Sequence, residues 1–157
     1  MFHDGHRKLQ VRFDGRQIAD AFEQRFRLSE LDSGEKKFIE NSEFFLATAH
    51  DGSVDCSYKG GVLGFVQVPE SASLEWTDYD GNSMYRSLGN IIGKPRVGLL
   101  FMRFGERPVR LRVNGVCELL DGASAGDKKI TVRLHTEEMS ANCPRYIPDL
   151  SRPSGSM

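Results

Sequence analysis

The hydrophobic pattern changes near Glu43, from sparse helical spacing to the short alternating runs that are typical of β-strands. "EFFLATA" has the composition of a buried strand, "HDG" indicates a hairpin turn, and "SVDCSYKG" alternates back along it. Five more runs have strand length: "VLGFVQV", "SLEWT", "RVGLLFM", "VRLRVNGVCELL" and "KKITVRLHT". About seven strands separated by turns predict a mainly β chain, an antiparallel barrel or sandwich rather than a βαβ fold.

The run "VRLRVNGVCELL" alternates so strongly that it predicts which side chains share a face of the strand. Its apolar face is expected to carry Val109, Leu111, Val113 and Val116. Arg110 and Arg112 are expected on the opposite face, where exposed arginines of a barrel strand are the preferred interpretation.

Helical spacing marks two segments before the first strand, and we expect both to be surface helices that cover one end of the fold. The first has an apolar face made of Ile18, Ala21, Phe22 and Phe26. The second, "SGEKKFIEN", is expected to be capped by Ser33 and to turn Phe38 and Ile39 inward.

The length of 157 residues predicts one domain. Within it, residues 1–42 are expected to form a helical leader, 43–147 the barrel, and the Pro/Ser-rich stretch 148–157 a frayed tail. Hydrophobic residues make up 39% of the chain, which leaves room for a partner subunit.

Charge and composition narrow the classes of function. The net charge of −1, from 21 basic and 22 acidic residues, lacks the basic excess of a nucleic-acid-binding protein. No apolar run reaches the ~18 residues of a membrane span, and the charged start is unlike a secretory signal. Three widely spaced cysteines are typical of reduced thiols and form no metal knuckle. We therefore expect a cytoplasmic protein with neither a metal site nor a membrane partner.

The strand "CSYKGG" is the first candidate for chemistry. Ser57 and Lys59 are two residues apart and so share a face, where a hydroxyl and an ammonium could hold one phosphate. Gly60 and Gly61 would let a ligand approach the backbone closely. An exposed strand that ends in a glycine bulge explains the same residues, so the spacing leaves both interpretations open.

The stretch "YDGNSMYRSLGN" is the second candidate. Met84, Leu88 and Ile91 recur at helical spacing up to Pro95, which predicts a short helix after the Asp-Gly-Asn turn. That helix is expected to start at Asn82, with Arg86 and Ser87 just inside it. Free backbone amides and an arginine at a helix start favour an anion, although a capped helix with a solvated charge is the alternative.

The segment "NCPRYI" combines a rigid proline with a cation and an aromatic ring. Cys143 has no histidine with an obvious pairing role, so the sequence favours a structural cysteine over a nucleophile. No GxSxG elbow, P-loop, GxGxxG or HExxH motif is present.

Five segments in this order resemble the pyridoxamine 5′-phosphate oxidase-like flavoproteins of the FMN-binding split-barrel superfamily. They span Phe44 to Ile147 and are "FFLATAHDGSVDCSYKGG", "GFVQV", "DYDGNSMYRSLGNIIGKPRVGLLF", "LRVNG" and "NCPRYI". The resemblance implies an antiparallel split barrel that forms a homodimer, with FMN in two clefts between the subunits. The cofactor-binding residues that it implies are Cys56, Ser57, Tyr58, Lys59, Gly60, Asp80, Gly81, Asn82, Arg86, Ser87, Asn142, Pro144, Arg145 and Tyr146.

Within that resemblance, Arg86 matches a phosphate-binding arginine, and Trp76 or Tyr79 is expected near the edge of the flavin ring. Ser87 departs from the family, because pyridoxamine phosphate oxidases have a second basic residue there, a role that Lys59 could fill. Their carboxy-terminal tryptophan and Arg-Leu-His-Asp-Arg signature is also replaced by "NCPRYIPDL". The resemblance implies an FMN-dependent oxidoreductase that acts on a small molecule. The alternatives are a non-catalytic protein that binds flavin, haem or a deazaflavin, and a structural barrel dimer with no cofactor.

Overall fold

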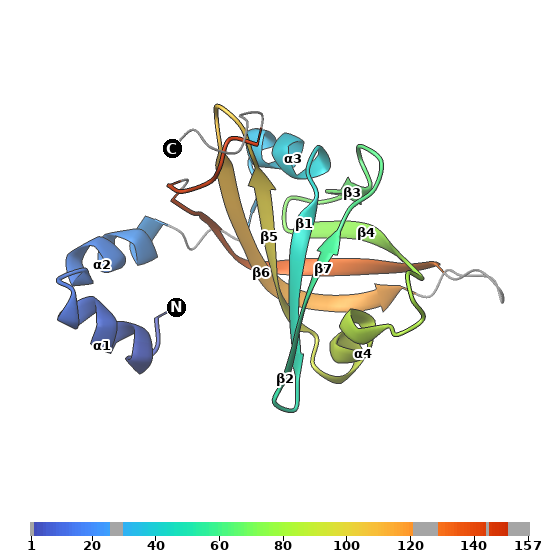
Figure 1. Cartoon of the computed structure of the whole chain (residues 1–157), viewed down its shortest axis with the longest axis horizontal. Helices are drawn as coiled ribbons and strands as arrows, with labels where there is room; N and C mark the ends of the chain where they lie inside the picture. The colour runs from blue at the N-terminus through green and yellow to red at the C-terminus, as the bar shows by residue number, and fades with distance from the viewer. Residues whose placement is uncertain (1, 26–29, 121–128, 144, 151–157) are drawn as a thin grey trace.

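A computed structural model describes residues 2–25, 30–120, 129–143 and 145–150, and their seven strands form one antiparallel sheet. The sheet curls into a partly closed barrel with the strand order β2-β1-β5-β6-β7-β4-β3 (Figure 1). The strands are β1 (Phe44–His50), β2 (Ser53–Lys59), β3 (Val66–Gln67), β4 (Ser73–Tyr79), β5 (Arg96–Arg103), β6 (Val109–Leu120) and β7 (Lys129–Ala141). The mainly β fold and the antiparallel split-barrel architecture predicted from the sequence are confirmed.

Helices cover the two ends of the barrel, with α3 (Ser33–Glu40) at one end and α4 (Arg86–Gly93) at the other (Figure 1). Asp32, not Ser33, caps α3: its Oδ1 accepts hydrogen bonds from the backbone N–H groups of Gly34 and Glu35 at 2.7 and 2.8 Å. The Glu35 carboxylate accepts from the Asp32 N–H in return, which completes a capping box. An aspartate is as good a cap as a serine, and the helix begins at Ser33, one residue earlier than a Ser33 cap predicted.

The core is built around a cluster of aromatic rings. Phe44 lies against Trp76 and Phe101, with ring centroids 5.2 and 5.1 Å apart. Phe44 and Phe101 are direct cross-strand partners of β1 and β5, so the strand register itself brings two of these rings together. Each of these side chains is almost completely buried, as are Leu46 and Leu99 on the same strands.

Three strand predictions need correction. β3 has only two residues, because Gly64 in the left-handed region turns the chain and leaves Val62 and Leu63 exposed. β7 extends five residues beyond Thr136 to Ala141, so that the long β6 keeps a partner along its length.

The third correction concerns Val116, which lies on the opposite face of β6 from the buried Val113, Gly115 and Cys117. The strand register slips at Asn114/Gly115, but the extra residue is Glu137 on β7, so alternation along β6 continues unbroken. A Cβ at Gly115 would collide with the His135 carbonyl oxygen, which explains the glycine at this crowded point.

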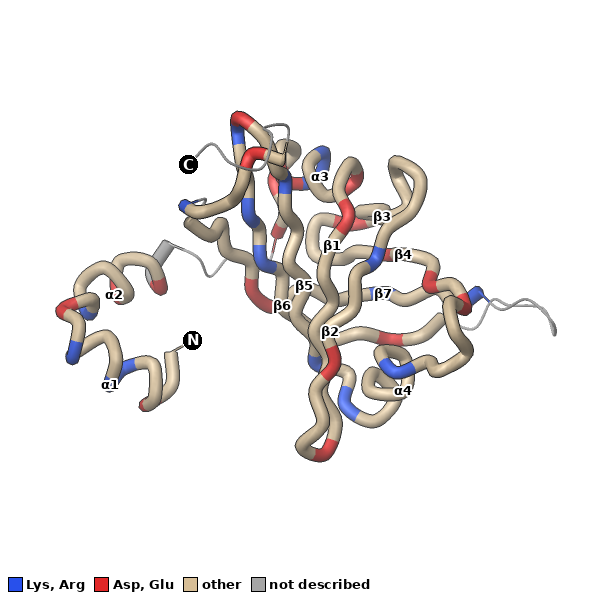
Figure 2. The backbone as a smooth tube through the Cα atoms, in the orientation of Figure 1, with Lys and Arg blue, Asp and Glu red and all other residues tan. Residues whose placement is uncertain are grey.

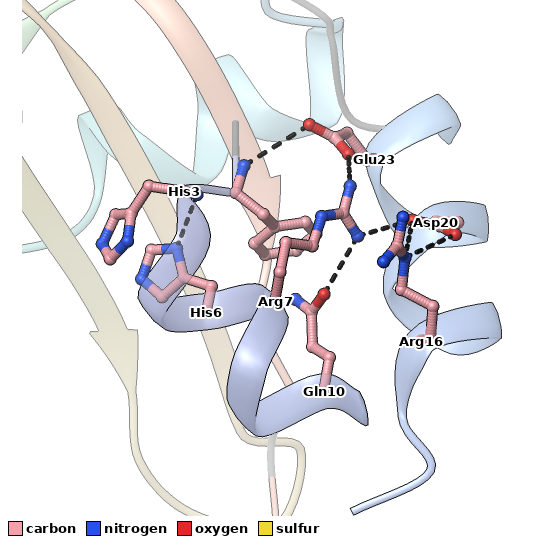
Figure 3. A network of polar contacts seen from close by, with 8 residues as sticks. His3, His6, Arg7, Gln10, Arg16, Asp20 and Glu23 are labelled. Carbon is pink, nitrogen blue, oxygen red and sulfur yellow. Dashed lines mark hydrogen bonds and ion pairs between the residues drawn. The ribbon is translucent and has the colours of Figure 1, made fainter. Parts of the chain in front are cut away.

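The amino-terminal helices α1 (Asp4–Arg12) and α2 (Arg16–Arg25) form a hairpin that stands beside the barrel (Figure 1). Arg7 joins them: its guanidinium bonds Asp20 at 2.6 Å and Glu23 at 2.7 Å (Figure 3). The hydrogen bond from Arg7 holds the pKa of the Asp20 carboxyl below its usual range. Charge pairs therefore connect the two helices.

The expected apolar face of this first segment does not pack on the barrel, because Ile18 and Ala21 are exposed. Phe26, which completes that predicted face, lies outside the described residues, as does the predicted tail from residue 151 onward. None of the helices in the described ranges is long and apolar enough to cross a bilayer.

Replacing Ile39 by alanine should destabilise the protein by about 2–5 kcal/mol, because the side chain is 0% exposed and its loss leaves a cavity. Ile18→Ala is the matched control, since this isoleucine is 76% exposed and its truncation should change stability by less than about 0.5 kcal/mol. Urea unfolding of both variants measures the difference. Equal destabilisation by the two substitutions would contradict the packing of α3 on the core.

Candidate functional site

A cleft of about 380 Å³ lies where the edge strand β2 meets the end of β4 and the start of α4. It brings together the two candidate segments "CSYKGG" and "YDGNSMYRSLGN", which are about 20 residues apart in the chain. Its walls include predicted residues from both segments: Ser57, Tyr58, Lys59, Gly60, Asp80, Gly81, Asn82, Arg86 and Ser87. The neighbouring Asp55, Asp78 and Tyr79 also line it.

A chain of three side chains joins β2 to α4 inside this cleft. The hydroxyl oxygens of Ser57 and Ser87 are 2.9 Å apart, and the Ser87 hydroxyl donates to the Asp55 carboxylate at 3.0 Å. Asp55, Ser57 and Lys59 alternate along β2, so all three side chains face the cleft, as the strand period requires. Ser87 thus connects α4 to β2 and at the same time lines the cleft.

Each basic side chain in the cleft has a carboxylate beside it. The Lys59 ammonium lies 2.6 Å from Asp78 Oδ2 in a close ion pair, although the approach is not that of an aligned hydrogen bond. The Asp78 side chain is only 8% exposed and that of Lys59 16%. Arg86 Nε lies 3.5 Å from Asp55 Oδ1, and with 55% of its side chain exposed Arg86 is the more accessible of the two cations.

Sequence reasoning missed both carboxylates. Asp55 could have been found, because the period of two that places Ser57 and Lys59 on one face includes it. Asp78 was missed because the predicted strand "SLEWT" ends at Thr77, whereas β4 continues to Tyr79.

The loop before α4 is shaped by its own side chains. Asp80 accepts hydrogen bonds from the Ser83 N–H at 2.6 Å and the Ser83 hydroxyl at 3.0 Å, and Asn82 Oδ1 accepts from the Met84 N–H. Ser83 and Tyr85 both have positive φ, a conformation that residues other than glycine adopt at a cost.

The predicted helix start at Asn82 is therefore wrong, since Asn82 stabilises the turn and α4 begins at Arg86. Tyr85 occupies the N-cap position, and no side chain caps this end of the helix. The first-turn N–H groups of α4 border the cleft and are a natural place for an anion.

Several predicted residues lie elsewhere in this chain. Cys56 is on the opposite face of β2 and does not line the cleft, and Trp76 is buried in the core rather than placed at a ligand's edge. Asn142, Arg145 and Tyr146 follow the end of β7, while the cleft adjoins its beginning through the Tyr79–Lys129 pair. Thirteen residues of strand separate those points, a path of about 40 Å. Pro144 lies outside the described residues.

Within the described ranges, no group of three histidine, cysteine or acidic side chains could hold a metal ion. Cys117 is buried in the barrel, and burial raises the pKa of its thiol to about 12. Cys56 and Cys143 are exposed. None of the described cleft residues is a cysteine, so the cleft offers no thiol nucleophile.

The curled antiparallel sheet, with a cleft between its edge strand and the helix α4 at the end of the barrel, defines the molecule as a split-barrel protein. A family model described as pyridoxamine 5′-phosphate oxidase matches residues 32–156, and the chain belongs to that family. No curated protein matches the chain.

Solved structures share this fold at low sequence identity. A conserved hypothetical protein from Mycobacterium tuberculosis is 16% identical with a TM-score of 0.55, over 83% of this chain and 95% of that one. An FMN-binding protein from Syntrophomonas wolfei is 11% identical with a TM-score of 0.51, over 85% and 95%. An F420 reductase is 18% identical with a TM-score of 0.51, over 70% and 98%. At these identities the likeness establishes the fold alone.

Cys117 should not react with a thiol reagent in the folded protein, because the thiolate is the reactive form and burial disfavours it. The double variant Cys56→Ser/Cys143→Ser isolates this thiol, and a disulfide reagent at pH 8 should detect none until guanidinium unfolds the chain. A matched variant that keeps only the exposed Cys143 should react at once. Rapid reaction of Cys117 in the folded state would show that β6 opens readily at its centre.

Proposed function

We propose that this protein is an FMN-binding flavoprotein and an FMN-dependent oxidoreductase that acts on a small organic molecule. The observation that carries the proposal is the set of phosphate donors that converge on the cleft from β2 and α4. Membership of the pyridoxamine 5′-phosphate oxidase family and the fold shared with an FMN-binding protein support it. Three free thiols in the chain are consistent with a cytoplasmic protein.

The donor set fits the phosphate end of such a cofactor. The Arg86 guanidinium matches phosphate oxygens with two parallel N–H groups, and its exposure leaves it free to turn toward a ligand. The hydroxyls of Ser57 and Ser87 are adjacent, and each can turn its proton from its present partner toward one anion. Lys59 would add a second cation in place of the basic residue that Ser87 replaces. The uncapped start of α4 contributes backbone amides.

Bound FMN supplies the hydride or electron transfer, and the protein positions it and sets its surroundings. Beside the polar end, the cleft is lined by Tyr79, Met84 and Tyr85, whose apolar surfaces could exclude water from a flat ring. The alternative function is a non-catalytic protein that binds flavin, haem or a deazaflavin. In such a protein the bound cofactor would not turn over, whereas in an oxidoreductase it would.

Arg86→Ala should weaken FMN binding by roughly 1.5–3 kcal/mol, about 10- to 150-fold in Kd, because one charge-assisted contact is lost. Fluorescence titration of FMN into the cofactor-free protein measures this change. Arg96→Ala is the control, since Arg96 pairs with Glu137 and does not line the cleft. Lys59→Ala is a poorer test, because it would leave the nearly buried Asp78 without its cation and destabilise the fold.

If wild-type protein binds no FMN, the cofactor proposal is rejected, and unchanged affinity in the Arg86→Ala variant rejects the phosphate assignment alone. The same FMN-loaded protein distinguishes enzyme from carrier. Loss of the flavin absorbance on adding NADH, NADPH or a candidate substrate would support the oxidoreductase, whereas a flavin that none of them reduces favours the non-catalytic alternative.

A homodimer belongs to the same proposal and is supported by an exposed apolar sheet surface. This outer face of β2, β1 and β5 is formed by Phe45, Ala47, Val54, Cys56, Tyr58 and Leu100. Phe45 and Tyr58 contact each other across the strands, with ring centroids 5.8 Å apart. Small side chains at Ala47 and Cys56 keep its centre flat. Tyr58 also borders the cleft, so a second copy seated here would stand next to the cofactor.

Ala47→Arg should convert the dimer into a monomer, because it places a charge at the centre of the outer face. Light scattering should give about twice the chain mass of 17.6 kDa for the wild type and the chain mass itself for the variant. Ala21→Arg is the matched control, because Ala21 is also exposed but lies on α2, outside the outer face. A wild-type mass near that of one chain at all concentrations would reject the dimer, and a dimeric Ala47→Arg variant would move the interface elsewhere.

A further inference from the structure

The cleft carries more acid than base, although its donors suit a phosphate. Among its described lining residues, the charged side chains are two cations, Lys59 and Arg86, and three carboxylates, Asp55, Asp78 and Asp80, which gives a formal net charge of −1. Figure 2 shows basic and acidic positions together around α4 and the neighbouring end of β4. A pocket selected for a doubly charged anion would instead be expected to carry an excess of positive charge.

The two cations are not free to give their full charge to a ligand. Lys59 lies 2.6 Å from Asp78, and Arg86 lies 3.5 Å from Asp55. Asp55 also accepts the Ser87 hydroxyl at 3.0 Å, so it is fixed at the same donors that a phosphate would use. With 14% of its side chain exposed, Asp55 cannot easily turn away into solvent. An arriving phosphate therefore meets a carboxylate that stays beside it.

Other groups around the cleft do not reverse this balance. The phenols of Tyr58 on β2, Tyr79 on β4 and Tyr85 in the following loop border it. Lys129 of β7 lies over the Tyr79 ring, 5.9 Å from its centroid, and is not a lining residue. None of the described lining residues is a histidine, so no imidazole adds charge near neutral pH.

We propose that this cleft takes its flavin phosphate in a singly charged form, either a phosphodiester or a phosphomonoester that keeps one proton. One negative charge satisfies Arg86 and the two serine hydroxyls, while a second would face Asp55 and Asp78 without a further cation from the same chain. A protonated phosphate oxygen can in addition donate a hydrogen bond to the Asp55 carboxylate. Asp55 is thus a specificity-determining residue. The inference rests on the proposed flavin site and names the charge state that the site selects.

The proposal predicts how FMN affinity depends on pH. A phosphomonoester loses its second proton near pH 6. If only the singly charged form binds, the apparent Kd for FMN should fall about 25-fold between pH 7.5 and pH 5.5. If the site prefers the doubly charged form, the same change of pH should instead raise Kd about fourfold. The two outcomes have opposite signs.

The experiment is a fluorescence titration of the wild-type protein at both pH values with three probes. They are FMN, the methyl ester of FMN, which is singly charged throughout, and riboflavin, which has no phosphate. The methyl ester should bind with the same Kd at both pH values and more tightly than FMN at pH 7.5. Riboflavin shows whether binding of the flavin ring itself depends on pH. The change in binding free energy of riboflavin between the two pH values is subtracted from that of FMN.

Two variants test the assignment to Asp55. Asp55→Asn keeps the shape and the acceptor for Ser87 but removes the charge, so it should tighten FMN binding at pH 7.5 and reduce the 25-fold pH effect to less than about fivefold. Asp51→Asn removes the same charge from the exposed tip of the β1–β2 hairpin, outside the cleft, and should leave the pH effect unchanged.

Weaker FMN binding at pH 5.5, a flat profile, or identical behaviour of the two variants would overturn the inference while leaving the flavin site in place. If none of the three flavins binds at either pH, the proposed function itself fails and the inference fails with it.

Discussion

The hydrogen bond between Ser57 and Ser87 is the contact on which the cleft depends, because it joins the edge strand of the sheet to a helix 30 residues further along the chain. An edge strand has unpaired backbone groups and is held from one side only. α4 is anchored independently, through the buried Leu88 and Ile91 and a hydrogen bond from Asn90 to Thr48 on β1. Because Ser57 on β2 is hydrogen-bonded to Ser87 on α4, the packing of this helix also holds β2 in place. The serine pair therefore links the strand that carries Lys59 to the helix that begins at Arg86.

Burial of the Lys59–Asp78 pair adds a second constraint. Removing two charges from water costs several kcal/mol per ion, and the attraction between them only partly offsets that cost. Such a pair is therefore weak evidence of stabilisation. In the proposed site, this pair would hold an ammonium at a defined place at the wall of the cleft without leaving it as an uncompensated charge. The same reasoning applies more weakly to Arg86 and Asp55, which are more exposed.

Local pattern was enough to predict a mainly antiparallel β fold, a barrel or a sandwich, because "VRLRVNGVCELL" alternates with a period of two and runs such as "RVGLLFM" have strand length. It also identified both halves of the cleft. It did not predict what depends on distant parts of the chain. Nothing near Val116 reveals that the extra residue of the bulge lies on β7, at Glu137. Likewise, Lys59 and Asp78 meet only because the sheet curls, so their ion pair has no signature in either segment. The start of α4 was misplaced because an asparagine can stabilise a turn as well as a helix end. Here the hydrogen bonds from Ser83 to Asp80 and from Met84 to Asn82 stabilise a turn, so the helix begins only at Arg86.

The length of β7 separates the cleft from the carboxy-terminal segment of the same chain. The cleft adjoins the beginning of this strand, and "NCPRYI" follows its end, where Asn142 donates to the Arg110 carbonyl at the far end of β6. A strand is stiff, so no local rearrangement brings Arg145 or Tyr146 to the cleft of the same chain. A twofold axis through the outer face would set β2 of one subunit beside the sheet of the other. That arrangement would let a segment far from its own cleft lie near the second one. In the proposed dimer, the apolar outer face and the distant carboxy-terminal segment would be two consequences of the same constraint.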